Sequence, residues 1–194
     1  MKKLIALILC LAMVTVLFVG CANDTESNSD PAPSSENTNT ENEKLVIGVA
    51  YQDFTNEFTT ELQIGVQNAA KELGVDLIEV DGKALAENQL SQVENFITQG
   101  VDGIILNPYD ADGCAPAVTA AKNAGIPIVV VNAKTSNVEE ADAFVGSDDV
   151  IGGEMEMQYV ADQLGGKGTI VIMSGLYGNS AQIDRQQGIE NILA

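Results

Sequence analysis

The chain has 194 residues, and its 28 acidic and 9 basic residues give a formal net charge of −19. Such an acidic excess argues against nucleic acid as a partner, because nucleic-acid binding requires clustered lysine and arginine. The absence of histidine from the sequence excludes histidine-based triads, histidine-ligated zinc and the commonest general base. Carboxylate-based hydrolysis stays formally possible, but no nucleophile–base pair supports it. We therefore expect a protein that is not an enzyme, with no cofactor and no metal site.

The start of the chain has the pattern of a secretion signal. A short positive segment precedes an almost unbroken apolar run over 4–18, which is too short for a comfortable permanent membrane span. The pair Gly20-Cys21 follows and suggests a bacterial lipobox, in which Cys21 is acylated and becomes the mature N-terminus. Phe18 is bulkier than the aliphatic residue usual at its place, and ordinary cleavage to a soluble secreted protein is the alternative. We predict a lipoprotein signal peptide over 1–20 and lipidation at Cys21.

The segment after this cysteine is polar and acidic. Over 22–43 alanine is the only aliphatic residue, and lysine and arginine are missing. Such a segment cannot bury enough apolar surface to offset its ordering entropy, so we predict a disordered acidic tether over 21–43. A flexible tether beside an acylated cysteine suits an extracytoplasmic domain that is lipid-anchored to the cell membrane.

Cysteine usage fits this interpretation. Cys10 would leave with the signal and Cys21 would carry lipid, so Cys114 would be the single thiol of the mature chain. No intrachain disulfide is then expected. We expect Cys114 to be a small buried apolar residue rather than a reactive thiol.

From residue 44 onward, short apolar runs typical of strands alternate with segments of helical periodicity that often end at glycine. The predicted strands are 45–50, 75–80, 101–108, 126–132, 143–149 and 169–175. Helices are predicted between them, including one over about 150–164 and a last one that begins near Ser180. Strands that are apolar on both faces and alternate with helices predict a doubly wound α/β fold with a parallel sheet. Ligands of such folds bind at the carboxyl ends of the strands.

These elements divide the chain unequally. The first five strands with their helices are enough for an N-terminal lobe over 44–148. The remaining 149–194 holds one strand and about two helices, and a lone strand is not independently stable. We therefore interpret 149–194 as a crossover and the start of a second, similar lobe in a C-terminally truncated chain. The alternative is a one-lobe protein whose last strand joins the first sheet.

Four stretches carry ordered motifs: AYQDFTNEFTTELQIG (50–65), GVDGIILNPYDADGCAPAVTAAKNAGIPIVVVN (100–132), FVGSDDVIGGEM (144–155) and GNSAQIDRQQGIENI (178–192). Together they resemble the periplasmic sugar-binding family that includes ribose-binding protein, a type I periplasmic binding protein fold. The resemblance implies two lobes that close on a small ligand and hand it to an ABC permease. LacI-type repressors share the fold, but the predicted lipobox and tether stand here in place of their DNA-binding helices.

The resemblance places Asp53, Asn56 and Phe58 in the first binding loop. Carboxylate and amide groups can hydrogen-bond sugar hydroxyls, and an aromatic ring can cover the C–H face of a sugar. The alternatives are capping of the following helix by Asp53 and Asn56, and a hydrophobic anchor for Phe58. Thr59 stands where the family often has a second aromatic residue, which puts a pentose-like ligand in doubt.

Two more ligand positions are implied near the ends of later strands. Asn132 stands where ribose binders carry an aspartate followed by arginine, and Ala133 replaces that arginine, so the ribose pattern is lost. Ser147 matches a ligand position beside the crossing between the lobes. The alternatives are a turn residue at Asn132 and helix capping by Ser147 and Asp148.

The remaining ligand positions lie in the second part of the chain. Arg185 matches the family's second-lobe arginine, whose planar fork suits two neighbouring hydroxyls or a carboxylate. Its alternative is a surface salt bridge with an acid such as Asp184. Leu176, in the loop after the sixth predicted strand, is a candidate for the pocket wall.

We expect an extracytoplasmic substrate-binding lipoprotein that captures a sugar or sugar-like solute for an ABC importer. Its expected partners are a small sugar or polyol, the permease membrane subunits and the membrane reached through the lipid anchor, with no nucleic acid, and we expect a monomer. The alternatives are a signalling receptor of the same fold that senses a sugar or autoinducer, and an inactive fragment.

Overall fold

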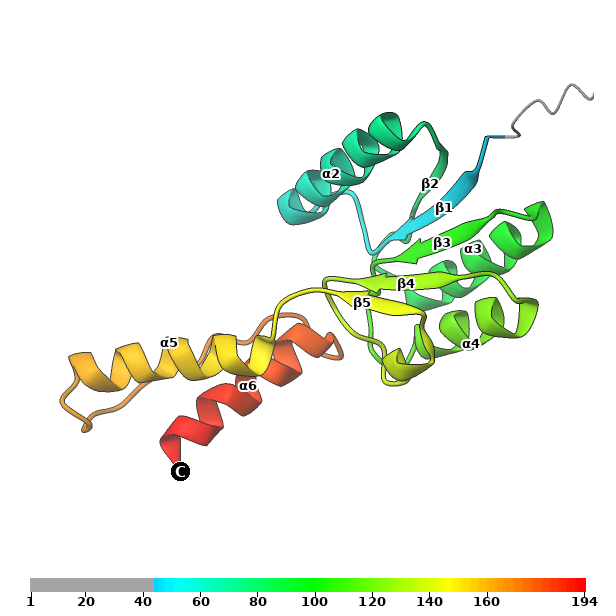
Figure 1. The fold of residues 1–194 in the computed structure, drawn as a ribbon. Coiled ribbons are helices and arrows are strands. Elements are labelled where there is room, and N and C mark those ends of the chain that lie inside the picture. The colour runs from blue at the N-terminus through cyan, green and yellow to red at the C-terminus, as the bar shows by residue number, and fades with distance from the viewer. Residues whose placement is uncertain (1–43) are drawn as a thin grey trace, which may run out of the picture. The chain divides into compact units, whose positions relative to one another are not determined.

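The computed structural model describes residues 44–194 (Figure 1). The predicted signal peptide, Cys21 and the tether lie outside the described residues. Within 44–194 no helix is long and apolar enough to cross a membrane.

A parallel sheet of five strands in the order β2-β1-β3-β4-β5 forms the centre of the fold. Its strands are β1 (Val46–Tyr51), β2 (Asp76–Asp81), β3 (Gly103–Leu106), β4 (Ile128–Val131) and β5 (Ala143–Val145). The first five predicted strands are therefore confirmed, although the last three are shorter than expected. The strand order reverses at β1, since β2 and β3 lie on its two sides, and ligands of doubly wound folds bind at such a point.

Three long helices connect these strands: α2 (Glu57–Leu73), α3 (Ala86–Gln99) and α4 (Ala115–Ala124), with a short 3₁₀ helix η1 (Val138–Glu140) before β5. Each long helix ends at a glycine in the left-handed conformation, at Gly74, Gly100 and Gly125. The N–H of each glycine returns to a carbonyl of the last turn, which closes the helix as the sequence predicts.

The helices cover both faces of the sheet, with α2 on one face and α3 and α4 on the other (Figure 1). The main core lies between the sheet and the helices α3 and α4. Its fully or almost fully buried side chains include Val93, Phe96, Ile104, Leu106, Val118, Ala121, Ile128 and Val130. The Phe96 ring packs against Gly48 of β1, where a Cβ would come within 2.6 Å of the ring. This packing fixes α3 against the strand whose carboxyl end opens toward the site.

The last part of the chain forms two helices, α5 (Asp149–Gln163) and α6 (Ser180–Leu193), which lie side by side (Figure 1). The sixth predicted strand, 169–175, is wrong, because this segment has no regular structure and pairs with no strand among the described residues. A strand needs the backbone of a neighbour, and the five-stranded sheet does not supply one. Val171 and Met173 are accordingly 87% and 93% exposed. The alternative in which this strand joins the first sheet is therefore not observed either.

Candidate functional site

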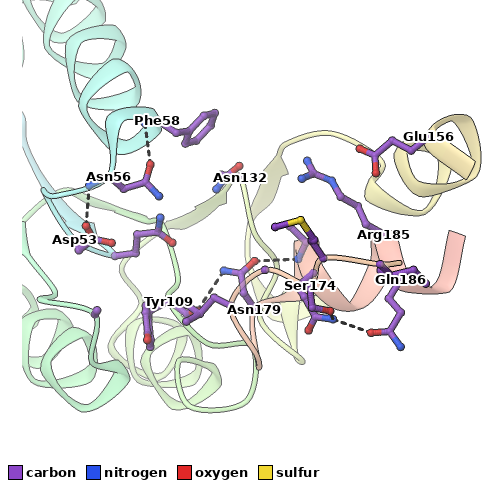
Figure 2. Close-up of a pocket in the computed structure, with 18 of the residues that line it drawn as sticks. Asp53, Asn56, Phe58, Tyr109, Asn132, Glu156, Ser174, Asn179, Arg185 and Gln186 are labelled. Carbon is purple, nitrogen blue, oxygen red and sulfur yellow. Dashed lines mark hydrogen bonds between the residues drawn. The ribbon is translucent and has the colours of Figure 1, made fainter. Parts of the chain in front are cut away.

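A cleft of about 800 Å³ lies at the carboxyl ends of β1, β3 and β4 (Figure 2). Loops of the sheet form one wall, and the segment 172–176, α5 and α6 form the other. The lining residues include Gln52, Asp53, Asn56, Phe58, Ala84, Tyr109, Asn132, Glu156, Ser174, Leu176, Asn179, Gln182, Arg185 and Gln186. The reversal of strand order therefore coincides with this cleft.

The loop after β1 supplies polar groups that have both a local role and a free side. The Asp53 Oδ1 accepts from the Thr55 N–H at 2.8 Å, the Thr55 hydroxyl at 2.7 Å and the Asn56 N–H at 2.9 Å. The Asn56 Oδ1 caps α2 by accepting from the Phe58 N–H at 2.8 Å. The second Asp53 oxygen and the Asn56 amide nitrogen have no hydrogen bond to the described chain and are available to a ligand.

The ring of Phe58 stands at the mouth of the cleft. Its side chain begins the first turn of α2 and is 53% exposed, so the helix does not use it as a buried anchor. The neighbouring Thr59 is fully buried and its hydroxyl accepts from the Gln52 amide at 3.3 Å. Thr59 therefore fixes a lining residue instead of facing the cleft.

Asn132 occupies the floor of the cleft in a left-handed backbone conformation, with φ of 67°. Its backbone N–H donates to the Val145 carbonyl at 2.8 Å, which joins the ends of β4 and β5. Asparagine tolerates this conformation better than most residues. The strained position aims the amide into the cleft between the two walls (Figure 2).

Arg185 reaches into the cleft from α6, with its guanidinium directed toward the side that carries Asn132 (Figure 2). Its Nη2 lies 2.9 Å from the Asp149 Oδ1 at the start of α5, and the Asp149 side chain is only 7% exposed. The expected alternative partner, Asp184, instead pairs with Lys134. The arginine is thus held by a buried carboxylate and keeps donors free for a ligand.

Polar contacts join the two walls of the cleft. The Lys134 N–H donates to the Ser180 hydroxyl at 2.6 Å, and its ammonium to the Asp184 Oδ2 at 2.9 Å. The hydrogen bond that the Lys134 ammonium donates to Asp184 raises the pKa of Lys134, and this effect exceeds the opposing effect of partial burial. The Asn179 amide donates to the Tyr109 carbonyl at 3.2 Å. The start of α6 is therefore fixed to the loops after β3 and β4.

Comparison with known proteins agrees with this geometry. A model described as the periplasmic binding protein domain matches residues 47–194. The chain belongs to this family.

Relatives of this periplasmic binding protein domain are named for small polyhydroxylated ligands. A xylitol-binding protein of Mycolicibacterium smegmatis is 40% identical over 89% of this chain and 45% of its own length. The ribose import binding protein of Bacillus subtilis is 32% identical over 99% of this chain and 60% of its own length. The chain thus spans about half of the length of these relatives, which are binding proteins rather than enzymes.

A solved structure is similar to this chain in both fold and sequence. A solute-binding protein of an ABC transporter from Bacillus halodurans, with bound myo-inositol, is 38% identical with a TM-score of 0.73. The match covers 77% of this chain and 52% of that one.

Six of the seven residues expected from the sequence to contact a ligand line the cleft. They are Asp53, Asn56, Phe58, Asn132, Leu176 and Arg185. Ser147 does not line it; its side chain is exposed, and the adjacent Asp148 alone caps α5 by accepting from the Val150 and Ile151 N–H groups.

Other lining residues were missed by sequence reasoning. Gln52 directly follows β1, and Tyr109 lies in the loop after β3, so their position after a buried strand is a signal that points to them. Glu156 and Gln186 lie in the middle of helices, where polar residues usually face solvent, and no sequence pattern distinguishes them.

The thiol of Cys114 and the phenol of Tyr51 lie near the sheet, and neither has the lowered pKa of an activated nucleophile. Burial raises the pKa of the Cys114 thiol, which is fully buried as expected. Burial and a hydrogen bond to Glu79 raise the pKa of the Tyr51 phenol. No group of metal-ligating side chains occurs within 44–194.

Proposed function

We propose that the chain captures a sugar or polyol outside the cytoplasm and presents it to an ABC importer. The observation that carries this proposal is the two-sided cleft, which brings Asp53, Asn56 and Asn132 opposite Arg185. The names of the relatives support the same ligand class, since they include a xylitol-binding and a ribose import binding protein.

The free groups of the cleft suit a polyhydroxylated ligand. The second oxygen of Asp53 accepts hydrogen bonds, the Asn56 nitrogen donates them, and Asn132 can do both. Arg185 adds charge-assisted donors in a planar fork. Mixed donors and acceptors match hydroxyl groups, each of which donates one bond and accepts others. The exposed Phe58 ring offers an apolar surface to the C–H face of the ligand.

We further propose that tight capture requires a complete second lobe. The relatives are about twice as long as their matched part. On the α2 side of the sheet, Val145 of β5 is 62% exposed, and the segment 169–175 is unpaired among the described residues. These apolar surfaces would be covered if further polypeptide extended the second lobe, and the ligand would then be enclosed.

We also propose lipid anchoring through Cys21. Support comes from the apolar run that precedes Gly20-Cys21 and from the acidic segment that follows. Replacing Cys21 with alanine should release the protein from membranes, since acyl chains contribute about 0.8 kcal/mol per buried methylene. A wild-type chain that fractionates as soluble and carries no lipid by mass spectrometry would refute the anchor.

A signalling role is the second candidate. One solved relative is the fructose-binding periplasmic domain of a hybrid two-component system, 27% identical with a TM-score of 0.72. The same cleft would then present its ligand to a membrane sensor. Crosslinking in membranes distinguishes the two roles, because an importer subunit is captured in one case and a sensor in the other.

The binding proposal is tested by titrating the protein with pentoses, hexoses, xylitol and myo-inositol. NMR detects weak binding by the 194-residue chain, and calorimetry measures a form completed with a matching second lobe. We expect weak binding by the first and tight binding by the second, because a solvated ligand gains only about 1 kcal/mol or less per hydrogen bond. A completed form that binds nothing in this panel would contradict the proposal.

A further inference from the structure

Two fully buried amide side chains lie beneath the cleft without lining it. They are Gln89 of α3 and Asn107 at the end of β3, and both are 0% exposed. A buried amide is costly unless its polar atoms are hydrogen-bonded. Gln89 shares the buried side of α3 with Val93 and Phe96, where an apolar side chain would pack without that cost. The amide at this position therefore needs a polar explanation.

Gln89 uses both ends of its amide on groups around the cleft. Its Nε2 donates to the Asn107 carbonyl at 2.8 Å and to the Ala50 carbonyl at 3.4 Å. Its Oε1 accepts from the Tyr109 N–H at 2.9 Å and from the Cys114 thiol at 3.1 Å. One side chain thus connects the end of β1, the end of β3 and the loop that carries Tyr109.

Asn107 adds a second connection to the end of β1 and a new one to the end of β4. Its Oδ1 accepts from the Gln52 N–H and its Nδ2 donates to the Val131 carbonyl, each at 3.4 Å. Gln52 lines the cleft, and Val131 directly precedes Asn132, which also lines it. Asn107 therefore contacts the backbone at or beside a ligand-facing residue on each side of β3.

These amides act where the sheet stops. The last paired residues are Ala50 with Leu106 and Leu106 with Val130. Beyond them the strands diverge into loops, and the ladder no longer fixes one loop relative to the next. An amide is suited to this place because it donates and accepts at once.

We propose that Gln89 and Asn107 are positioning residues of the ligand site, which fix Gln52, Tyr109 and Asn132 relative to one another. This inference rests on the proposed function only in treating the cleft as the ligand site. The two amides contact no ligand, and they act by holding the residues that do. A site held in this way is preorganised, so less ordering is needed when ligand binds.

The test compares Gln89→Glu with Gln92→Glu in the 194-residue chain. Glutamate keeps the shape and the acceptor of Gln89 but places a carboxylate against the carbonyls of Ala50 and Asn107. Gln92 lies on the same helix, is half-buried and donates to the Asp81 carbonyl at 2.7 Å, at the end of β2. Asp81 does not line the cleft, so this variant controls for a buried charge on α3.

Two measurements are made on each variant under conditions in which it is folded. Amide hydrogen exchange of Gln52, Tyr109 and Asn132 is followed by NMR without ligand. Affinity for myo-inositol, xylitol and D-ribose is then measured by NMR titration. We expect Gln89→Glu to speed exchange at these amides and to weaken binding about ten-fold or more, as loss of outer hydrogen bonds does at metal sites. Gln92→Glu should leave both unchanged.

The outcomes separate this inference from the proposed function. Wild-type exchange at all three amides in Gln89→Glu would overturn the inference, as would effects no larger than those of Gln92→Glu. If the wild-type chain binds none of the three probes, exchange alone decides whether Gln89 positions the loops, and the ligand assignment is decided by the completed form. If Gln89→Glu does not fold, Gln89→Met, which is of similar size and lacks the amide, is measured with the same expectations.

Discussion

Polar side chains of the cleft divide their hydrogen-bonding groups between the fold and the ligand space. Asp53 and Asn56 each use one oxygen to fix the first turn of α2. For these two residues, sequence reasoning set capping against ligand contact as alternatives. The structure shows that one residue can have the geometry for both, because a carboxylate or an amide has two polar atoms. A sequence cannot assign individual atoms, so this division could not be predicted.

Arg185 is expected to affect both binding and stability. Arg185→Ala removes the cation that pairs with Asp149, whose side chain is only 7% exposed. Arg185 itself is 52% exposed, so we expect a loss of about 1–2 kcal/mol in the free energy of unfolding, below the cost of breaking a fully buried pair. Chemical denaturation measures this loss. In the completed form, ligand affinity should fall by about 2–4 kcal/mol.

The double variant with Asp149→Asn is the control for Arg185. Removing the buried charge should recover most of the lost stability but none of the lost affinity. Recovery of both would mean that Arg185 acts only through the helix pair, and it would remove this residue from the ligand site.

The ion pair between Lys134 and Asp184 should make the stability of the fold depend on pH in the alkaline range. Its pKa is raised by Asp184, so the folded state holds this proton more tightly than the unfolded state. The stabilisation is fully present below the ordinary lysine pKa and is lost as pH rises through the raised value. We expect less than about 1 kcal/mol, because the pair is partly exposed. Urea unfolding of wild type and Lys134→Met at pH 8 and pH 11 should show a difference that shrinks at the higher pH; a constant difference would contradict this explanation.

At the scale of elements, the hydrophobic periodicity and the glycines at helix ends predicted five strands and their helices. These predictions succeeded because each of the five strands pairs with a neighbouring strand of the same sheet. The segment 169–175 is rich in apolar residues like the strands, yet it is irregular, since no strand among the described residues pairs with it. The sequence predicted a ligand site at the carboxyl ends of the strands, and the cleft lies there after β1, β3 and β4 but not after β5. Glu156 and Gln186 were not predicted, because their position depends on how α5 and α6 pack.

The crossing of α5 and α6 depends on two glycines. A Cβ on Gly153 would collide with the Arg185 carbonyl, and a Cβ on Gly188 with the Val150 carbonyl. Gly153→Ala should therefore separate the helices and destabilise the chain by about 1–3 kcal/mol, the usual cost of overpacking. Gly65→Ala in α2 is the matched control, since nothing lies within 4 Å of its added Cβ.

The control should gain about 0.5–1 kcal/mol, because alanine is a better helix residue than glycine. Thermal unfolding compares the two variants. Equal gains at Gly153 and Gly65 would show that the close helix crossing does not occur in solution.

At the scale of the whole molecule, order should be uneven along the described chain. The sheet, α3 and α4 share one buried core that extends from β1 to β4. By contrast, only Gly153, Met157 and Asp149 of α5 and Ser180 and Gly188 of α6 are buried. The second part of the chain therefore depends on a few contacts with the loops after β3 and β4, such as those of Lys134.

Hydrogen exchange measured by mass spectrometry should report this difference directly. We expect slow exchange in the strands and in α3 and α4, because opening them exposes the core and costs a large part of the global free energy of unfolding. The segment 167–175 should exchange fastest, since its N–H groups make no backbone hydrogen bond within the described chain. Peptides of α5 and α6 should lie between these extremes, because the helices are hydrogen-bonded but little buried. Lys134→Met should speed exchange in α6 and leave β1 and β3 unchanged, which separates local release of α6 from global unfolding. Uniformly slow exchange up to residue 190 in a monomer would contradict this view, since it would require a partner for 167–175 that the fold described here does not contain.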